Sequence, residues 1–209
     1  MDIRVIEFLT SRMCHDLISP IGAVHNGIEF LQEMEVEDID DAIGLIAHSS
    51  SQASARLQLF RLVYGAGVKT TALEVKDIYK VMDAYIKGDD KVTQSWSPED
   101  ELLDTTPSTG FCKMLLSGML IAYESLPKGG VIKVEKGTDG DVLIHATGDD
   151  AVPREGMDKG LSGDLDLDEM DPRLVHSYVT WLMGKAYGYD IALKNVLDNH
   201  VTLSLSATE

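Results

Sequence analysis

Apolar residues recur at helical spacing through the first part of the chain. With about 100° of rotation per residue, one set of side chains falls within about 40° of a single line along a helix. The members of this stripe are Ile6, Leu9, Met13, Leu17, Val24, Ile28 and Leu31. The pattern predicts a long amphipathic helix over residues 2–33 with the stripe buried. Pro20 removes one backbone hydrogen bond inside this helix and predicts a kink.

A second helix is predicted after the acidic stretch at residues 33–38, which interrupts the apolar spacing. Asp38 is placed to cap this helix, and the glycines at 65 and 67 to end it. The residues that repeat at helical spacing are Ile39, Ile43, Ile46, Ala47, Ala53, Ser54, Leu57 and Phe60. Because two helices bury too little surface alone, we expect a homodimer in which two hairpins form a four-helix bundle. The alternative is that the hairpin packs against the rest of its own chain.

After Val68 the pattern changes to mixed helices and strands. Helices are predicted at 73–86, 109–126 and 172–186, and strands at 92–96, 131–135, 142–146, 191–195 and 201–205. A long acidic loop precedes the last helix. The sequence therefore predicts an α+β protein with two domains, a helical hairpin at 1–67 and an α/β sandwich at 68–209.

Composition narrows the range of partners. The 209 residues are 44% hydrophobic, which indicates a folded chain, and the net charge of -17 argues against binding to nucleic acid or to an anionic membrane. Cys14 and Cys112 are too few for a disulfide framework. With neither a membrane-spanning run nor a signal segment evident in the sequence, we expect a cytoplasmic protein whose partner is another protein.

The candidate chemistry lies opposite the apolar stripe. His15 is about 180° away from it, and Ser11, Ser19 and Gly22 share its outward face. Imidazole is largely neutral near pH 7 and carries a lone pair that can attack phosphorus, whereas a lysine would be protonated and a serine would need a base. The alternative is an ordinary surface histidine.

The residues around His15 resemble the H-box of two-component histidine kinases and histidine phosphotransferases. That motif has an apolar residue, a small residue, His-(Asp/Glu)-Leu and a proline five positions after the histidine. The matching residues are Met13, Cys14, His15, Asp16, Leu17 and Pro20. The resemblance implies that His15 is phosphorylated on a ring nitrogen. Asp16 then either hydrogen-bonds the other ring nitrogen or is a polar flank.

The second half resembles the ATP-binding domain of histidine kinases in element order and in the turn at residues 126–130, but lacks its nucleotide ligands. Ser117 and Ile121 occupy the positions of the kinase asparagines, and an isoleucine cannot coordinate Mg²⁺. Ala146 replaces the adenine-binding aspartate, and residues 174–177 contain no glycine. The following acidic segment would repel a triphosphate. Either this is a degenerate nucleotide domain or it is an unrelated α/β domain, and in both cases ATP binding is not expected.

Together these features resemble the ChpT-type histidine phosphotransferases of alphaproteobacterial phosphorelays. The resemblance implies that His15 relays a phosphoryl group between aspartates of receiver domains. It also implies a homodimer, a receiver of a hybrid kinase upstream, and response regulators downstream. The chain itself would bind no cofactor, and the receiver would bring Mg²⁺. Two alternatives remain: an atypical ATP-dependent kinase and a non-catalytic receiver-binding adaptor.

The same resemblance predicts where a receiver would dock. Ser11, Ser19 and Gly22 leave room for a receiver helix beside the histidine, and Ile18 and Ile21 supply apolar contacts. Ordinary helix surface is the alternative interpretation of all five.

Overall fold

The computed structural model describes residues 2–33, 39–65, 73–88, 90–168 and 170–208. The helices are α1 (Ile3–Glu33), α2 (Ile39–Tyr64), α3 (Val75–Ile86), α4 (Thr109–Glu124), α5 (Met157–Ser162) and α6 (Val175–Tyr187), with a 3-10 turn η3 (Pro172–Leu174) before α6. The strands are β1 (Val92–Gln94), β2 (Gly130–Lys136), β3 (Val142–Thr147), β4 (Tyr189–Leu197) and β5 (His200–Ala207). The predicted cap at Asp38, the glycine at 67 and the predicted domain boundary lie outside the described residues.

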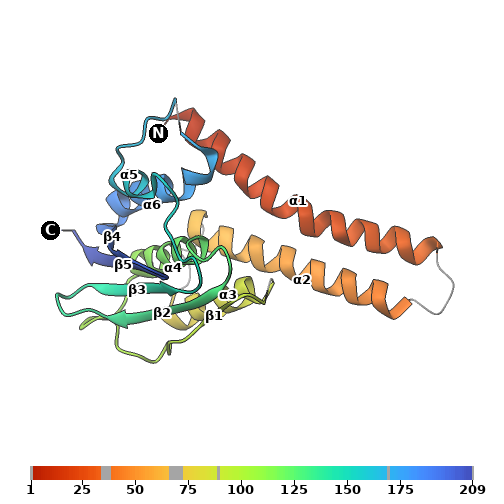
Figure 1. Ribbon diagram of the computed structural model, residues 1–209, viewed down its shortest axis with the longest axis horizontal. Helices are drawn as coiled ribbons and strands as arrows, with labels where there is room; N and C mark the ends of the chain where they lie inside the picture. Colours follow the sequence, from red (N-terminus) through yellow and green to blue (C-terminus); the bar gives the residue numbers. More distant parts are fainter. Residues whose placement is uncertain (1, 34–38, 66–72, 89, 169, 209) are drawn as a thin grey trace.

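Helices α1 and α2 form a long hairpin that projects from the α/β part of the molecule (Figure 1). Pro20 lies inside α1 and is buried, and α1 continues through it to Glu33, so the prediction of one long helix is confirmed. The two helices approach closely at Gly27, where an added Cβ would lie 2.6 Å from Ile46 Cγ1. A larger residue there would separate the helices.

The predicted burial of the whole apolar stripe on α1 is wrong for the single chain. The buried residues of α1 are Val5, Pro20 and Gly27, whereas Ile6 and Ile28 are each 44% exposed. In the projecting part of the hairpin, α1 is covered by α2 alone, and one neighbouring helix cannot cover a stripe of that width. The hairpin therefore keeps apolar surface in solvent.

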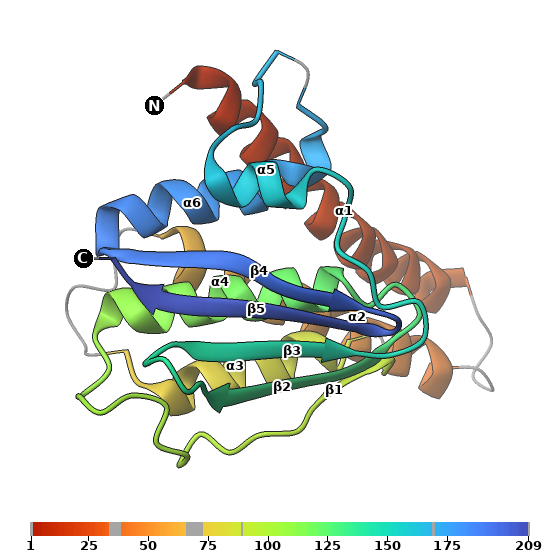
Figure 2. The same ribbon diagram turned by 60° about the vertical axis from the view of Figure 1, so that its left-hand side comes forward.

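The second half is a two-layer sandwich (Figure 2). Its sheet has the strand order β1-β2-β3-β5-β4, in which β1 and β2 are parallel and the other neighbours antiparallel. Helices α3, α4 and α6 pack on one face. Along β3 the buried residues Val142, Ile144 and Ala146 alternate with more exposed ones, as expected for a sheet with one covered face.

Helix α4 is the centre of the core. Every residue from Phe111 to Ala122 is buried, and the helix contacts sheet strands on one side and α2, α3 and α6 on the others. Lys113 lies within this run and donates from Nζ to the Gly65 carbonyl at 2.6 Å, at the end of α2. The end of the hairpin is thus tied to the core of the sandwich.

The N-terminal end of α1 packs against η3 and α6, at the helical layer of the sandwich. Val5 joins Met170, Leu174, Val175 and Val179 in a second buried cluster. Phe8 and Leu9 add partly buried contacts to it. The first turns of α1 are therefore held by η3 and α6, which places the next turns beside the segment that leads into η3.

Two elements differ from those predicted. The acidic loop contains α5, which begins after Gly156 and ends at Gly163, both at positive φ. Six residues between two glycines are too few to show helical spacing. The predicted helix from Pro172 begins as a 3-10 turn and becomes α-helical at Val175. Within the described ranges, no helix is long and apolar enough to cross a membrane.

Candidate functional site

His15 lies on the exposed face of α1. Its side chain is 89% exposed, and Ser11 and Ser19 one turn on either side are also exposed. Gly22 is partly exposed, and an added Cβ there would meet nothing within 4 Å. The small residues that the sequence placed around the histidine therefore leave open space on one helix face.

The two predicted apolar contacts are also open to solvent. Ile18 is 69% exposed and Ile21 is 54% exposed. Helical rotation places Ile18 beside the His15 face and Ile21 farther round toward the hairpin edge. Ile18 and Ile21 therefore add apolar surface next to the exposed histidine.

Asp16 is placed to orient the imidazole. Its Oδ1 lies 3.3 Å from His15 Nδ1, and its Oδ2 lies 3.9 Å from Arg12 Nε. Arg56 of α2 donates to the Asp16 carbonyl oxygen, which fixes this turn of α1 against α2. A carboxylate beside Nδ1 favours the tautomer with the proton on Nδ1, so the lone pair is on Nε2.

Arg12 connects the histidine turn to the sandwich. It forms an ion pair with Glu124 at the end of α4, and both side chains are largely buried. Burial raises the pKa of Glu124, and Arg12 only partly opposes that effect. The pair therefore joins α1 to α4 directly beneath the His15 turn.

Beside His15 lies a pocket of about 410 Å³ that brings distant parts of the chain together. We call it the arginine pocket, and it is lined by Ser11, Arg12, His15, Asp16, Arg154, Pro172 and Arg173. Sequence reasoning missed all three arginines as site residues. Arg154 is one of the few basic residues in the acidic segment that precedes the last helix, and no local spacing relates it to His15.

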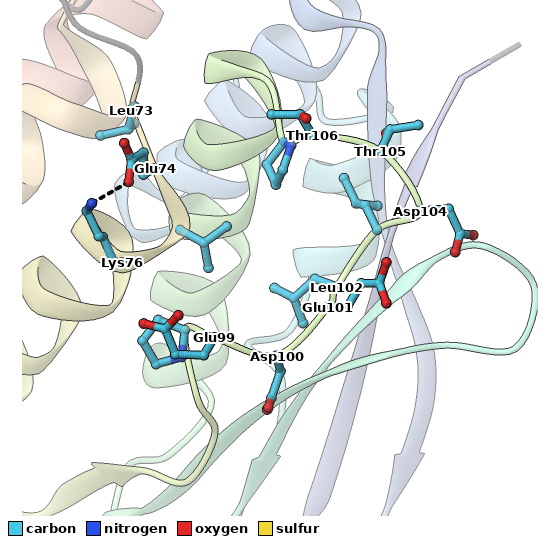
Figure 3. Close-up of a pocket in the computed structure, with 14 residues that line it drawn as sticks. Leu73, Glu74, Lys76, Glu99, Asp100, Glu101, Leu102, Asp104, Thr105 and Thr106 are labelled. Carbon is cyan, nitrogen blue, oxygen red and sulfur yellow. Dashed lines mark ion pairs between the residues drawn. The ribbon is translucent and has the colours of Figure 1, made fainter.

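A second hollow, of about 810 Å³, has the opposite charge (Figure 3). It lies between the start of α3 and the loop at residues 98–107. Its acidic residues are Glu74, Glu99, Asp100, Glu101 and Asp104. Lys76 is paired with Glu74 at 2.6 Å, as the dashed line in Figure 3 marks. This surface would repel a phosphoryl group.

The residues that the sequence comparison aligned with the nucleotide ligands of kinases lie in the core. Ser117, Ile121 and Ala146 are fully buried. His176, in the segment where the kinase glycines would lie, is also fully buried; its Nδ1 accepts from the Tyr64 hydroxyl at 2.7 Å and its Nε2 donates to the Ser117 carbonyl at 3.1 Å. Burial, with a smaller contribution from Arg12, lowers the pKa of His176 to about 3.

The remaining histidines give no indication of a metal centre. His145 lies on the outer sheet face with Nδ1 3.2 Å from His200 Nε2, and burial lowers its pKa. In the part of the chain that the structure describes, no three His, Cys, Asp or Glu residues are grouped so that they could hold a metal ion.

Comparisons with known proteins agree on one family. The family model for the histidine phosphotransferase C-terminal domain matches residues 75–198. The chain is 33% identical over 190 residues to the protein phosphotransferase ChpT of Brucella abortus (strain 2308), covering 88% of this chain and 87% of that protein. A bacterial phosphotransferase solved at 1.7 Å superposes with a TM-score of 0.79 at 28% identity, covering 99% of this chain and 97% of that one.

Proposed function

The chain belongs to the histidine phosphotransferase family, and from that premise we propose that His15 is the residue that carries the phosphoryl group. The observation that supports this assignment best is the open imidazole of His15, with Asp16 beside Nδ1 and Nε2 left free. His15 thus combines access for a partner with a nucleophilic nitrogen.

The reaction needs little from this chain beyond a positioned nitrogen. His15 Nε2 attacks the phosphorus of an aspartyl phosphate, the N–P bond forms as the P–O bond to the aspartate breaks, and the carboxylate leaves. Asp16 keeps the proton on Nδ1 and balances the positive charge that the ring gains. The same steps in reverse pass the phosphoryl group to the aspartate of a second receiver. We expect Mg²⁺ to arrive with the receiver domain and to neutralise phosphoryl charge there.

The surface around His15 suits a receiver helix. Ser11, Ser19 and Gly22 leave the space that a helix needs to approach the imidazole, and Ile18 and Ile21 offer apolar contact. We infer that the receiver of a hybrid kinase docks here as donor and that response regulators dock here as acceptors.

We also propose that the hairpin pairs with a second copy. Large apolar side chains remain exposed along it, namely Ile28, Phe30, Ile43, Leu45 and Leu57. Burying such a surface in a four-helix bundle would complete the core that α1 and α2 begin. With a chain mass of 22.9 kDa, light scattering should give 2 × 22.9 = 45.8 kDa, and a mass of 22.9 kDa would contradict the dimer.

The second domain is not expected to bind ATP. Ile121 and Ala146 supply neither a metal ligand nor an adenine-binding acid, and both are packed in the core. His176 fills the neighbouring space and uses both ring nitrogens in hydrogen bonds. We propose that phosphoryl groups therefore enter this protein through receivers.

The test is a labelling experiment with two phosphodonors. Wild-type protein, His15→Ala and His25→Ala are incubated separately with a phosphorylated receiver domain and with labelled ATP. His25 is a matched control because it is an exposed histidine on the same helix. We expect acid-labile label from the receiver alone, in the wild type and His25→Ala and not in His15→Ala.

Each other outcome favours a different function. Label from ATP would mean that the second domain is a working kinase. Label that persists in His15→Ala would move the phosphoacceptor elsewhere, and no label from either donor would leave a receiver-binding adaptor.

A further inference from the structure

The arginine pocket joins the His15 turn to a segment of the second domain. Ser11, Arg12 and Asp16 come from α1, Arg154 from the loop before α5, and Arg173 from η3. Packing of Val5 against Leu174 and Val175 holds this end of α1 beside η3. The pocket therefore depends on the fold of both halves of the chain.

The three guanidinium groups of this pocket differ in how far their charge is already neutralised. Arg12 pairs with Glu124 and lies near Asp16, and Arg173 pairs with Asp171 at 2.5 Å. Arg154 forms no ion pair within the described residues, and its buried Nε has no hydrogen-bond partner there. Glu124 and Asp171 lie near enough to Arg154 for its charge to act on their carboxyl groups, but both carboxylates make their direct ion pairs with the other two arginines. Arg154 is thus the pocket arginine with donor capacity left for a further anion, and it lines the same pocket as the proposed phosphoacceptor.

An unpaired buried guanidinium nitrogen is costly unless it gains a partner. The group that would supply one is an anion with several acceptor oxygens, and arginine binds phosphoryl oxygens with two parallel donors. We propose that Arg154 binds the phosphoryl group carried by His15 in the interval between its arrival from one receiver and its delivery to the next. This inference rests on the proposed function of His15.

The expected consequence is a longer-lived phosphohistidine. Loss of the phosphoryl group to water breaks the N–P bond, forms a bond from the water oxygen to phosphorus, and returns the electron pair to the imidazole. In the loose transition state of this reaction, electron density on the phosphoryl oxygens helps to expel the ring. A guanidinium that hydrogen-bonds those oxygens withdraws electron density from them. It therefore slows the expulsion of the ring and stabilises the phosphorylated state.

The experiment measures the lifetime of that bond in the full-length protein. Wild type, Arg154→Ala, Arg154→Gln, Arg154→Lys and Lys159→Ala are labelled by a phosphorylated receiver, separated from it, and followed at pH 7 as label is lost. Lys159→Ala is the matched control, since it removes one positive charge from an exposed residue of the neighbouring α5 that does not line the pocket.

We expect Arg154→Ala and Arg154→Gln to shorten the half-life about five- to tenfold, as suits one charge-assisted contact at a half-buried site. Arg154→Lys should recover part of the loss, and Lys159→Ala should match the wild type. A purely structural role would not be restored by a cation of different shape. Two substitutions of Arg154 keep the test valid if one of them impairs folding.

Equal half-lives in wild type, Arg154→Ala and Arg154→Gln would overturn the role of Arg154 and leave the proposed function intact. An equal shortening in Lys159→Ala would also overturn it, because general charge would then explain the effect. A wild-type protein that takes no label from the receiver would instead overturn the proposed function, and this inference with it.

Discussion

The outward face of α1 and the core between α4 and α6 differ in how far their candidate functional positions are open to solvent. Around His15 the exposed side chains include small ones, and among the described residues the one polar contact of the ring is that of Nδ1 with Asp16. Ser117, Ile121 and His176, which the sequence comparison aligned with nucleotide-binding positions of kinases, are fully buried. A residue that reacts with a protein partner must be exposed, whereas residues packed in the core cannot reach a ligand. Three predictions test this difference between the exposed face and the buried core by measuring stability, its pH dependence and the rate of phosphoryl transfer.

The largest effect is expected from placing an asparagine at the buried position 121 of α4. Ile121→Asn removes a buried apolar side chain and buries an amide with no arranged partner, so it should lower the free energy of unfolding by about 3 kcal/mol. Urea unfolding measures this loss, and calorimetry should find no ATP binding. The same substitution at exposed Ile18 should cost only about 0.5 kcal/mol. Equal losses at the two positions would remove the contrast.

A smaller change in the free energy of unfolding is expected when the pH is lowered, because His176 is buried in its neutral form. The unfolded side chain takes up a proton near pH 6.5, whereas the folded one does so only near pH 3. Stability contributed by the neutral ring is therefore present above pH 6.5 and is lost progressively as the pH falls toward 3. Between pH 7 and pH 5 the loss should be about 2 kcal/mol.

The measurement for this second prediction is a difference between two proteins. The raised pKa of Glu124 acts in the opposite direction, because protonating that carboxyl on acidification favours the folded state. Urea unfolding of wild type and His176→Gln at pH 7 and pH 5 cancels Glu124 and isolates His176. A pH dependence unchanged by His176→Gln would show that the buried ring does not contribute.

The smallest effect concerns the open face. Ile18→Asn should slow phosphoryl transfer from a receiver about fivefold, equivalent to about 1 kcal/mol of lost apolar contact, while leaving stability nearly unchanged. Stopped transfer reactions at low receiver concentration measure the rate. Ile3→Asn is the control, because Ile3 is 64% exposed on the same helix and lies about four turns away from Ile18. Equal slowing by both variants would place docking elsewhere.

The sequence predicted the elements best where spacing is long and regular. Helices α1, α2 and α4 and strands β2, β3, β4 and β5 lie close to their predicted ranges, since each carries several turns of an apolar stripe or an alternating run. Helix α5 was missed because its six residues are defined by flanking glycines at positive φ. The exposed part of the α1 stripe was predicted buried because spacing identifies an apolar face without identifying what covers it.

In the candidate site, too, the residues that regular helix geometry relates to one another were predicted, and a residue from a distant segment was not. The open face of His15, Ser11 and Ser19 follows from helix geometry alone, and the structure places these residues as predicted. Arg154 could not have been found, because it reaches the pocket only through the packing of η3 and α6 on α1. Contacts between distant segments depend on the tertiary fold, which residue spacing does not contain.

The links beneath the His15 turn have a thermodynamic consequence for partners. Arg12 joins α1 to Glu124 of α4, the Tyr64 hydroxyl joins α2 to His176 of α6, and Lys113 joins α4 to the end of α2. These contacts hold the hairpin and the sandwich at one angle before any partner arrives. A receiver that touches both would not have to spend binding energy on ordering one wall of its site relative to the other. A partner that touches both surfaces would therefore gain affinity and specificity from their fixed relative arrangement.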